Sequence, residues 1–60
     1  MSYYRLYFWA RNRIAAVEDF LAASDQAALD RVPGYQRGLD TELWNQNRLV
    51  GTFTAERQIA

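Results

Sequence analysis

The sequence predicts an α+β domain of order ββαββ, in which two β-hairpins form one antiparallel sheet and one short helix packs on one face. Two stretches share the pattern W-x-x-N-R-[IL], the first beginning at Trp9 and the second at Trp44. Aromatic and β-branched residues flank both copies, which is typical of strands. Between the copies, Ser24 and Asp25 precede an alanine-rich run, which is typical of a helix start.

The first copy predicts the first hairpin. The aromatic run from Tyr3 to Trp9 favours a strand, and the residues from Arg13 to Leu21 return as a second strand. Between them, Ala10-Arg11-Asn12 is predicted to be a three-residue loop, because Asn tolerates the left-handed backbone that closes such a loop.

The helix is predicted to begin after Ser24, whose hydroxyl suits an N-cap, with Asp25 at the positive end of the helix dipole. A narrow apolar stripe at helical spacing follows, made of Ala27, Ala28, Leu29 and Val32. Pro33-Gly34 is predicted to end the helix, because proline disfavours the helical conformation of the residue before it.

The second copy predicts the second hairpin. After a loop from Tyr35 to Leu39 with a turn at Gly38, the strands are predicted at 41–44 and 48–54, around Asn45-Gln46-Asn47. Residues 1–54 are therefore expected to form a single small domain. Residues 55–60 are expected to be a C-terminal tail, frayed or folded as a short helical turn.

Three-residue loops would place Trp9 opposite Arg13 and Trp44 opposite Arg48, and side chains alternate faces along each strand. The face under the helix is then predicted to carry Tyr4, Leu6, Phe8, Ile14, Ala16, Leu43, Leu49 and Phe53. The opposite face is predicted to carry Tyr3, Arg5, Tyr7, Trp9, Arg13, Ala15, Val17, Glu42, Trp44, Arg48 and Val50. Glu18 falls on the helix side, where an ion pair with Arg31 or Arg37 is the expected explanation.

The face away from the helix is the candidate binding surface, since one short helix cannot cover both faces of a four-stranded sheet. Its candidate residues are Tyr3, Arg5, Tyr7, Trp9, Arg13, Trp44 and Arg48. Arginine stems could simply shield the tryptophan rings from water. The face could form a homodimer or bind a protein partner, because Trp, Tyr and Arg are enriched at interfaces. It could also stack the bases of a nucleic acid.

Composition narrows the function further. A chain of 60 residues is a marginal domain that often gains stability from a partner. Without Cys or His, it has no thiol nucleophile, no imidazole base and no usual zinc ligand, so we expect no enzyme, no cofactor and no metal site. Asp40 and Glu42 are interpreted as solvated charges at an edge rather than as a weak cation site.

Zero net charge argues against a protein dedicated to binding polyanions. It also leaves little electrostatic repulsion between copies of the chain to oppose self-association. The sequence therefore predicts a small non-enzymatic protein-interaction module that self-associates through the aromatic and arginine face or through a strand edge. The alternative is a nucleic-acid-associated accessory protein. No run approaches the roughly 20 apolar residues of a membrane span, and we expect a cytoplasmic protein with no membrane partner.

Several segments together resemble a group of small uncharacterised bacterial proteins. These segments are 3–8 (YYRLYF), 18–20 (EDF), 23–25 (ASD), 42–44 (ELW) and 48–51 (RLVG). The resemblance covers most of the chain and implies a small, soluble, cytoplasmic protein. It implies no activity and no site residues. Pro33-Gly34 stands where a longer helix is expected from this resemblance.

Overall fold

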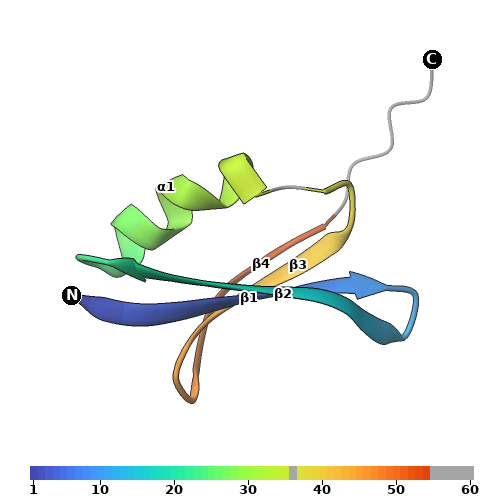
Figure 1. The fold of residues 1–60 in the computed structure, drawn as a ribbon, viewed down its shortest axis with the longest axis horizontal. Helices are drawn as coiled ribbons and strands as arrows, with labels where there is room; N and C mark the ends of the chain where they lie inside the picture. Colours follow the sequence, from blue (N-terminus) through green and yellow to red (C-terminus); the bar gives the residue numbers. More distant parts are fainter. Residues whose placement is uncertain (36, 55–60) are drawn as a thin grey trace.

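The computed structural model describes residues 1–35 and 37–54, which form a four-stranded antiparallel sheet with one helix on one face (Figure 1). Its elements are β1 (Ser2–Ala10), β2 (Arg13–Ala22), α1 (Asp25–Tyr35), β3 (Asp40–Asn45) and β4 (Arg48–Phe53). This order confirms the predicted ββαββ fold. The tail predicted at 55–60 lies outside the described residues.

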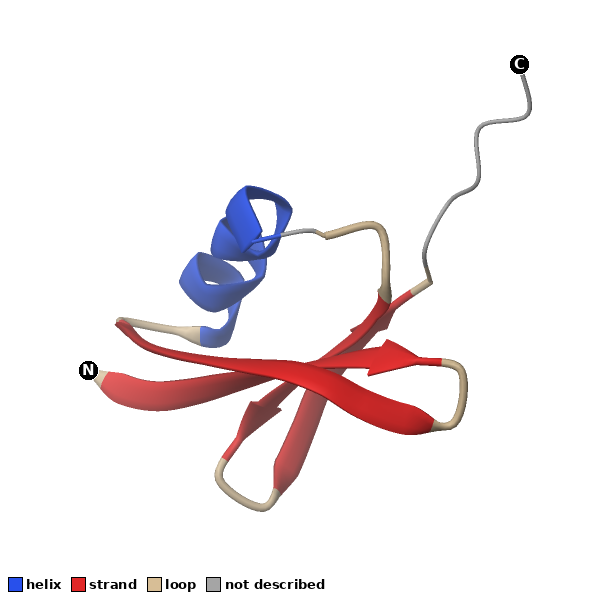
Figure 2. Cartoon of the chain, turned by 45° about the vertical axis from the view of Figure 1, so that its right-hand side comes forward, coloured by secondary structure: helices blue, strands red, loops and turns tan. Residues whose placement is uncertain are grey.

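The strand order is β2-β1-β3-β4, so the first strand of each hairpin lies at the centre of the sheet. β1 is antiparallel to both of its neighbours, and β2 and β3 therefore run in the same direction on either side of it. α1 connects these two strands across one face of the strongly twisted sheet (Figure 2). Within residues 1–35 and 37–54, no helix lies on the opposite face of the sheet.

The core lies between α1 and the central strands. Alternate residues of β1 are buried, as a half-buried strand requires: Tyr4, Leu6 and Phe8. Leu43 of β3 lies beside them, and the other buried apolar residues are Phe20, Ala22, Ala28 and Val32. The apolar floor predicted for the helix is thus confirmed for its central members.

α1 begins as predicted and ends later than predicted. The Ser24 hydroxyl accepts a hydrogen bond from the backbone N–H of Ala27 at 3.1 Å, which confirms the N-cap. The predicted end at Pro33-Gly34 is wrong, because the helix continues to Tyr35. The Tyr35 ring stacks on Phe20, with ring centroids 5.3 Å apart. This packing supports the last turn and offsets the backbone hydrogen bond that Pro33 cannot donate.

Both hairpin loops contain two residues, so the predicted three-residue loops are wrong. Ala10 pairs with Arg13 across Arg11-Asn12, and Asn45 pairs with Arg48 across Gln46-Asn47. The left-handed backbone lies one residue earlier than predicted, at Arg11 (φ 61°) and Gln46 (φ 56°) rather than at the asparagines.

A β-bulge follows each loop. In the first hairpin, Trp9 pairs with Ile14 but Phe8 pairs with Ala16, which leaves Ala15 as an extra residue in β2. In the second hairpin the same shift leaves Val50 as an extra residue in β4. The prediction that the repeated pattern forms two hairpins of one geometry is therefore confirmed, although the geometry itself differs from the predicted one.

The loops and bulges together determine which face each side chain occupies. A loop one residue shorter than predicted moves the residues next to it to the other face, and the bulge moves the rest of the strand back. Ile14 and Leu49 therefore lie on the face away from α1, contrary to prediction. Ala16 and Phe53 remain on the α1 side, packed against the core as predicted. Val50, predicted to face away from α1, also packs against the core.

Candidate interaction surface

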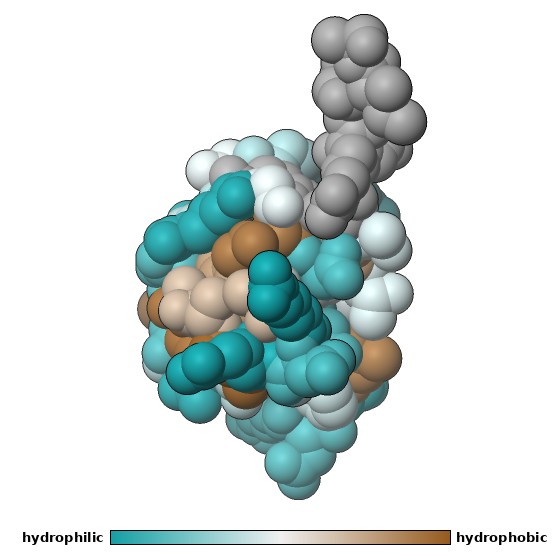
Figure 3. All heavy atoms as spheres, turned by 90° about the vertical axis from the view of Figure 1, so that its right-hand side faces the viewer, coloured by the Kyte–Doolittle hydropathy of each residue, from teal (hydrophilic) through white to brown (hydrophobic). Residues whose placement is uncertain are grey.

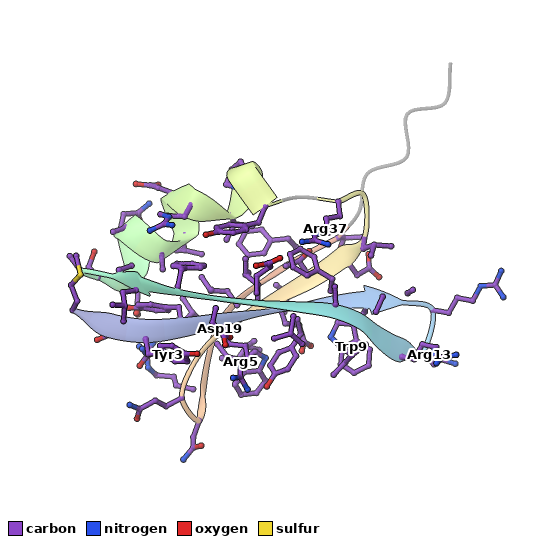
Figure 4. All side chains as sticks on the ribbon, viewed as in Figure 1. Tyr3, Arg5, Trp9, Arg13, Asp19 and Arg37 are labelled. Carbon is purple, nitrogen blue, oxygen red and sulfur yellow. The ribbon has the colours of Figure 1, made fainter. Side chains whose placement is uncertain are left out.

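The sheet face opposite α1, which we call the open face, collects side chains from all four strands. Figure 4 shows Tyr3, Arg5 and Trp9 on this side of the sheet, whereas Arg37 lies on the side of α1. The strand registers give its members as Tyr3, Arg5, Tyr7, Trp9, Ile14, Val17, Asp19, Leu21, Asp40, Glu42, Trp44, Leu49 and Thr52. Within residues 1–35 and 37–54, no element packs over this face.

The open face holds most of the exposed large apolar side chains of the described chain. Their exposed fractions are 47% for Tyr3, 45% for Ile14, 44% for Val17, 53% for Leu21 and 46% for Leu49. The remaining one is Met1, at the start of the chain. Monomeric proteins seldom expose a continuous apolar patch of this kind, and such patches mark interaction sites.

Arg5 is the only arginine that the registers of the described strands place on the open face, and its charge is neutralised within that face. Asp19 accepts hydrogen bonds from Arg5 Nε at 2.7 Å and Nη2 at 3.2 Å, and from the Tyr3 hydroxyl at 2.6 Å. The Arg5 guanidinium, followed by the Tyr3 hydroxyl, lowers the pKa of Asp19 below its usual value. Arg5 is consequently committed to an ion pair and presents little free charge to a partner.

The two tryptophans of the repeated pattern converge on one carboxylate. Trp9 Nε1 and Trp44 Nε1 each donate a hydrogen bond to Glu42 Oε1 at 3.2 Å. This convergence follows from the pairing of β1 with β3, which places Glu42 opposite Tyr7 and between the two indoles. Beside it lies an open cavity of about 430 Å³, lined by Tyr7, Trp9, Ile14, Glu42, Trp44, Gln46 and Asn47.

Arg48 lies on the side of α1, contrary to prediction. Its Nη1 and Nη2 donate to the two carboxylate oxygens of Asp25, at 2.8 and 2.9 Å. The Tyr4 hydroxyl donates to the same carboxylate at 2.7 Å. Arg48, followed by Tyr4, lowers the pKa of Asp25 from 3.8 to about 2. This arginine fastens β4 to the first turn of the helix and is not part of the open face.

The predicted pairing of Trp9 with Arg13 is also wrong, because Arg13 pairs with Ala10 and Trp9 pairs with Ile14. Arg13 lies at the end of the first hairpin (Figure 4). Viewed from that end, hydrophilic side chains dominate the surface and apolar ones show between them (Figure 3). The other predicted pair fails in the same way, since Trp44 faces Leu49.

The arginine–ring contacts of the described residues lie on the side of α1 instead. The Arg31 guanidinium lies 4.7 Å from the Phe20 ring centroid, and that of Arg37 lies 5.0 Å from the Phe8 centroid. Arg37 also donates a hydrogen bond to Glu18, which confirms one of the two partners predicted for that carboxylate.

The structure thus keeps five of the seven candidate residues on the open face: Tyr3, Arg5, Tyr7, Trp9 and Trp44. Sequence reasoning missed the role of Glu42 as the acceptor for both indoles. Its spacing of two residues from Trp44 puts the pair on one face, and this was a usable signal. The position of Trp9 next to Glu42 depends on the pairing of β1 with β3, for which the sequence carries no local signal.

Among residues 1–35 and 37–54, no group of three or more His, Cys, Asp and Glu side chains could hold a metal ion. No helix in this part of the chain is long and apolar enough to cross a membrane. Comparisons of the chain with protein-family models, with curated proteins and with solved structures gave no match.

Proposed function

We propose that this chain is a small protein-interaction module that self-associates through its open face. The observation that carries the proposal is the concentration of exposed apolar side chains on that face, from Leu21 and Tyr3 at one end to Ile14 and Leu49 near the hairpin loops. Two such faces can pack as a β-sandwich, in which the inner side chains of both sheets form a second core.

The Arg5–Asp19 pair and the net charge of the chain are compatible with pairing of two copies. Arg5 and Asp19 neutralise each other, and the chain carries zero net charge, so two copies repel each other little as a whole. A twofold axis would bring the same patch of both copies together, as in the commonest homodimers. Burial of Val17 and Leu21 against a second copy would remove two of the exposed apolar side chains from water.

The experiment is sedimentation velocity from about 1 μM to about 1 mM protein, a range that detects weak dimers. We expect the wild-type chain to convert from one copy to two. We expect Val17→Lys, which places a charge among the exposed apolar side chains of β2 on this face, to raise the dimer Kd roughly ten-fold or more. Gln26→Lys, an exposed position on α1, is the matched control and should leave the Kd unchanged.

A wild-type chain that stays monomeric throughout this range would refute the proposal. A dimer that survives Val17→Lys unchanged would place the contact elsewhere, for instance on the free edge of β2 or β4, and would also refute the role of the open face. Urea unfolding of Val17→Lys at low concentration verifies that the variant remains folded.

The nucleic-acid hypothesis has weaker support from the charges. Arg5 is bound to Asp19 and Arg48 to Asp25, so two of the three arginines predicted for the candidate binding surface are neutralised within the chain. We therefore expect no binding to single-stranded oligonucleotides, even at low ionic strength where phosphate contacts are strongest.

A further inference from the structure

The cavity beside Glu42 contains a negative charge, and no described residue that lines it is positively charged. Among the described lining residues, Glu42 is the only charged one. Its partners are the N–H groups of Trp9 and Trp44, which are neutral. In the described part of the chain, the arginine–carboxylate ion pairs use Glu18, Asp19 and Asp25, and none reaches Glu42. The carboxylate is half-buried, so water screens its charge less than at a fully exposed site.

Aromatic side chains surround this charge. Tyr7, Trp9 and Trp44 line the cavity together with the carboxylate, and Ile14 adds an apolar wall. The faces of aromatic rings attract cations, most strongly for Trp, and quaternary ammonium groups are typically bound by such rings. Rings and a carboxylate in one cavity are complementary to a cation that also carries apolar surface.

The hydrogen bonds of Glu42 distinguish between kinds of organic cation. Both indoles donate to Oε1, so they use the two acceptor positions of that oxygen, and among the described residues no donor reaches Oε2. A guanidinium group gains most from a bidentate contact with both oxygens. An alkylated ammonium needs no bidentate contact, because it interacts through its charge and through contact of its alkyl groups with the rings.

We infer that the cavity formed by Tyr7, Trp9, Glu42 and Trp44 binds an alkylated ammonium group. The site is complete in one copy of the chain, so the inference goes beyond self-association and does not depend on it. A dimer formed through the open face would cover the cavity, and the cation would then compete with the second copy.

The experiment uses choline as the probe and its neutral carbon analogue, 3,3-dimethylbutan-1-ol, as the matched ligand. The full chain contains two tryptophans, so its two indole N–H signals in an NMR spectrum report directly on the cavity. The titration is run at a protein concentration at which sedimentation shows single copies. We expect choline to shift both signals along one saturable curve, with an affinity in the range of about 1 mM, and the neutral analogue to bind at least about five-fold more weakly.

Two carboxylate variants separate the charge in the cavity from the charge of the whole chain. Glu42→Gln keeps the shape and an acceptor for the indoles but removes the charge, and we expect it to weaken choline binding about five-fold or more. Asp30→Asn removes an exposed carboxylate of α1, on the other side of the sheet, and we expect it to change the affinity less than about two-fold. Circular dichroism checks that both variants are folded.

Equal binding of choline and its neutral analogue would overturn the inference, as would unchanged binding by Glu42→Gln or shifts that sodium chloride reproduces. Tighter binding of methylguanidinium than of choline would overturn the assignment to alkylated ammonium. Because the titration uses single copies, a negative result would leave the proposed self-association standing. A monomeric chain that binds choline would refute self-association and leave this site intact.

Discussion

At the scale of single residues, Arg11 and Gln46 take the left-handed conformation of the two turns, although the sequence favours Asn12 and Asn47 for it. Both take positive φ, at 61° and 56°. This conformation is unfavourable for any residue that has a side chain, whereas glycine adopts it at little cost in free energy. Each is the first of two loop residues, a position where a two-residue hairpin loop favours glycine. The same unfavourable conformation therefore recurs in both hairpins.

Replacement of Arg11 by glycine should stabilise the protein. We expect Arg11→Gly to raise the free energy of unfolding by about 0.5–1 kcal/mol. Glycine removes the steric cost of positive φ in the folded state, and this gain exceeds the loss caused by the larger conformational entropy of the unfolded chain. Urea unfolding followed by circular dichroism measures this change. Asn12→Gly is the control, since Asn12 does not take positive φ and should gain nothing. A larger gain from Asn12→Gly than from Arg11→Gly would contradict this account of the turn.

Glu42 shows at the same scale how one side chain acquires a role from its neighbours. As a residue next to Leu43 on a strand, it alternates with a core position and is expected on the opposite face. Its hydrogen bonds to Trp9 and Trp44 connect β1 with β3 across that face. The carboxylate thus links the two hairpins, in addition to the backbone pairing of their first strands.

At the scale of elements, the bulges are the feature with the greatest consequence. Each hairpin combines a short loop with one extra residue, so its strand changes face next to the loop and returns to the expected face after the bulge. Ile14 and Leu49 are consequently added to the open face, and Val50 is moved to the core. The apolar area of the open face therefore depends on this pair of bulges.

A matched pair of leucines tests the bulge of the second hairpin. Leu43 is fully buried, whereas Leu49 is 46% exposed on the open face, although the strand pattern predicts both for the core. We expect Leu43→Ala to lower the free energy of unfolding by about 2–5 kcal/mol, enough to unfold a domain of this size. We expect Leu49→Ala to cost less than about 1 kcal/mol in the monomer.

Far-UV circular dichroism and urea titration at low protein concentration measure both leucine variants. Equal destabilisation by the two substitutions would contradict the register of β3 and β4. A measurement at high concentration adds a test of the proposed dimer, in which Leu49→Ala should weaken association.

α1 shows a second case in which tertiary packing overrides a local preference. Pro33 removes a backbone donor within the helix, and the residue before a proline normally leaves the helical conformation. Val32 is nevertheless buried, and Tyr35 stacks on Phe20 one turn further along. The contact of Tyr35 with Phe20 is available only if the helix continues past the proline.

At the scale of the whole molecule, three ion pairs of the described residues connect segments that are distant in the sequence. Arg5 and Asp19 join β1 to β2, and Arg37 joins the segment after α1 to Glu18 of β2. Arg48 and Asp25 join β4 to the start of α1, where the Tyr4 hydroxyl also donates to the carboxylate. These pairs are at least one-third exposed, so each contributes modestly, and the Arg48–Asp25 pair connects the helix to the sheet.

The pair of Arg48 and Asp25 makes stability depend on pH in a defined range. The pKa of Asp25 is about 2 in the folded protein, against 3.8 for the ordinary carboxyl, because of Arg48 first and Tyr4 second. Its contribution is complete above the unfolded value of 3.8 and is lost as pH falls toward 2. We expect the urea midpoint to decrease over this interval, with part of the decrease due to Asp19, whose pKa is also lowered.

Two variants isolate the contribution of Asp25. Asp25→Asn removes the titrating group and Arg48→Gln removes its cation, so each should flatten the pH dependence between about 4 and about 2. The decrease of the urea midpoint with falling pH that remains in these variants should be due to Asp19. A wild-type slope in both variants would show that Asp25 does not cause the acid sensitivity.

Much of the fold follows from local signals that a single sequence carries. The cap at Ser24, the alternation of buried residues from Tyr4 to Phe8 and the equivalence of the two hairpins depend on contacts within a few residues. The same local reasoning identified Tyr3, Tyr7, Trp9 and Trp44 as members of one face. These features are readable because helix caps and strand periodicity are properties of neighbouring residues.

The arrangement of the candidate site required contacts between distant segments. The pairing of β1 with β3 brings Trp9 to Glu42, a residue 33 positions away along the chain. The two-residue loop of the second hairpin exchanges Arg48 for Leu49 on the open face, because one residue of register moves every adjacent side chain to the other side of the sheet. From the residue pattern alone, this protein is two equivalent hairpins with a capped helix between them. The open face became an apolar surface with a carboxylate between two indoles only when strand pairing and register had assigned each side chain to its side.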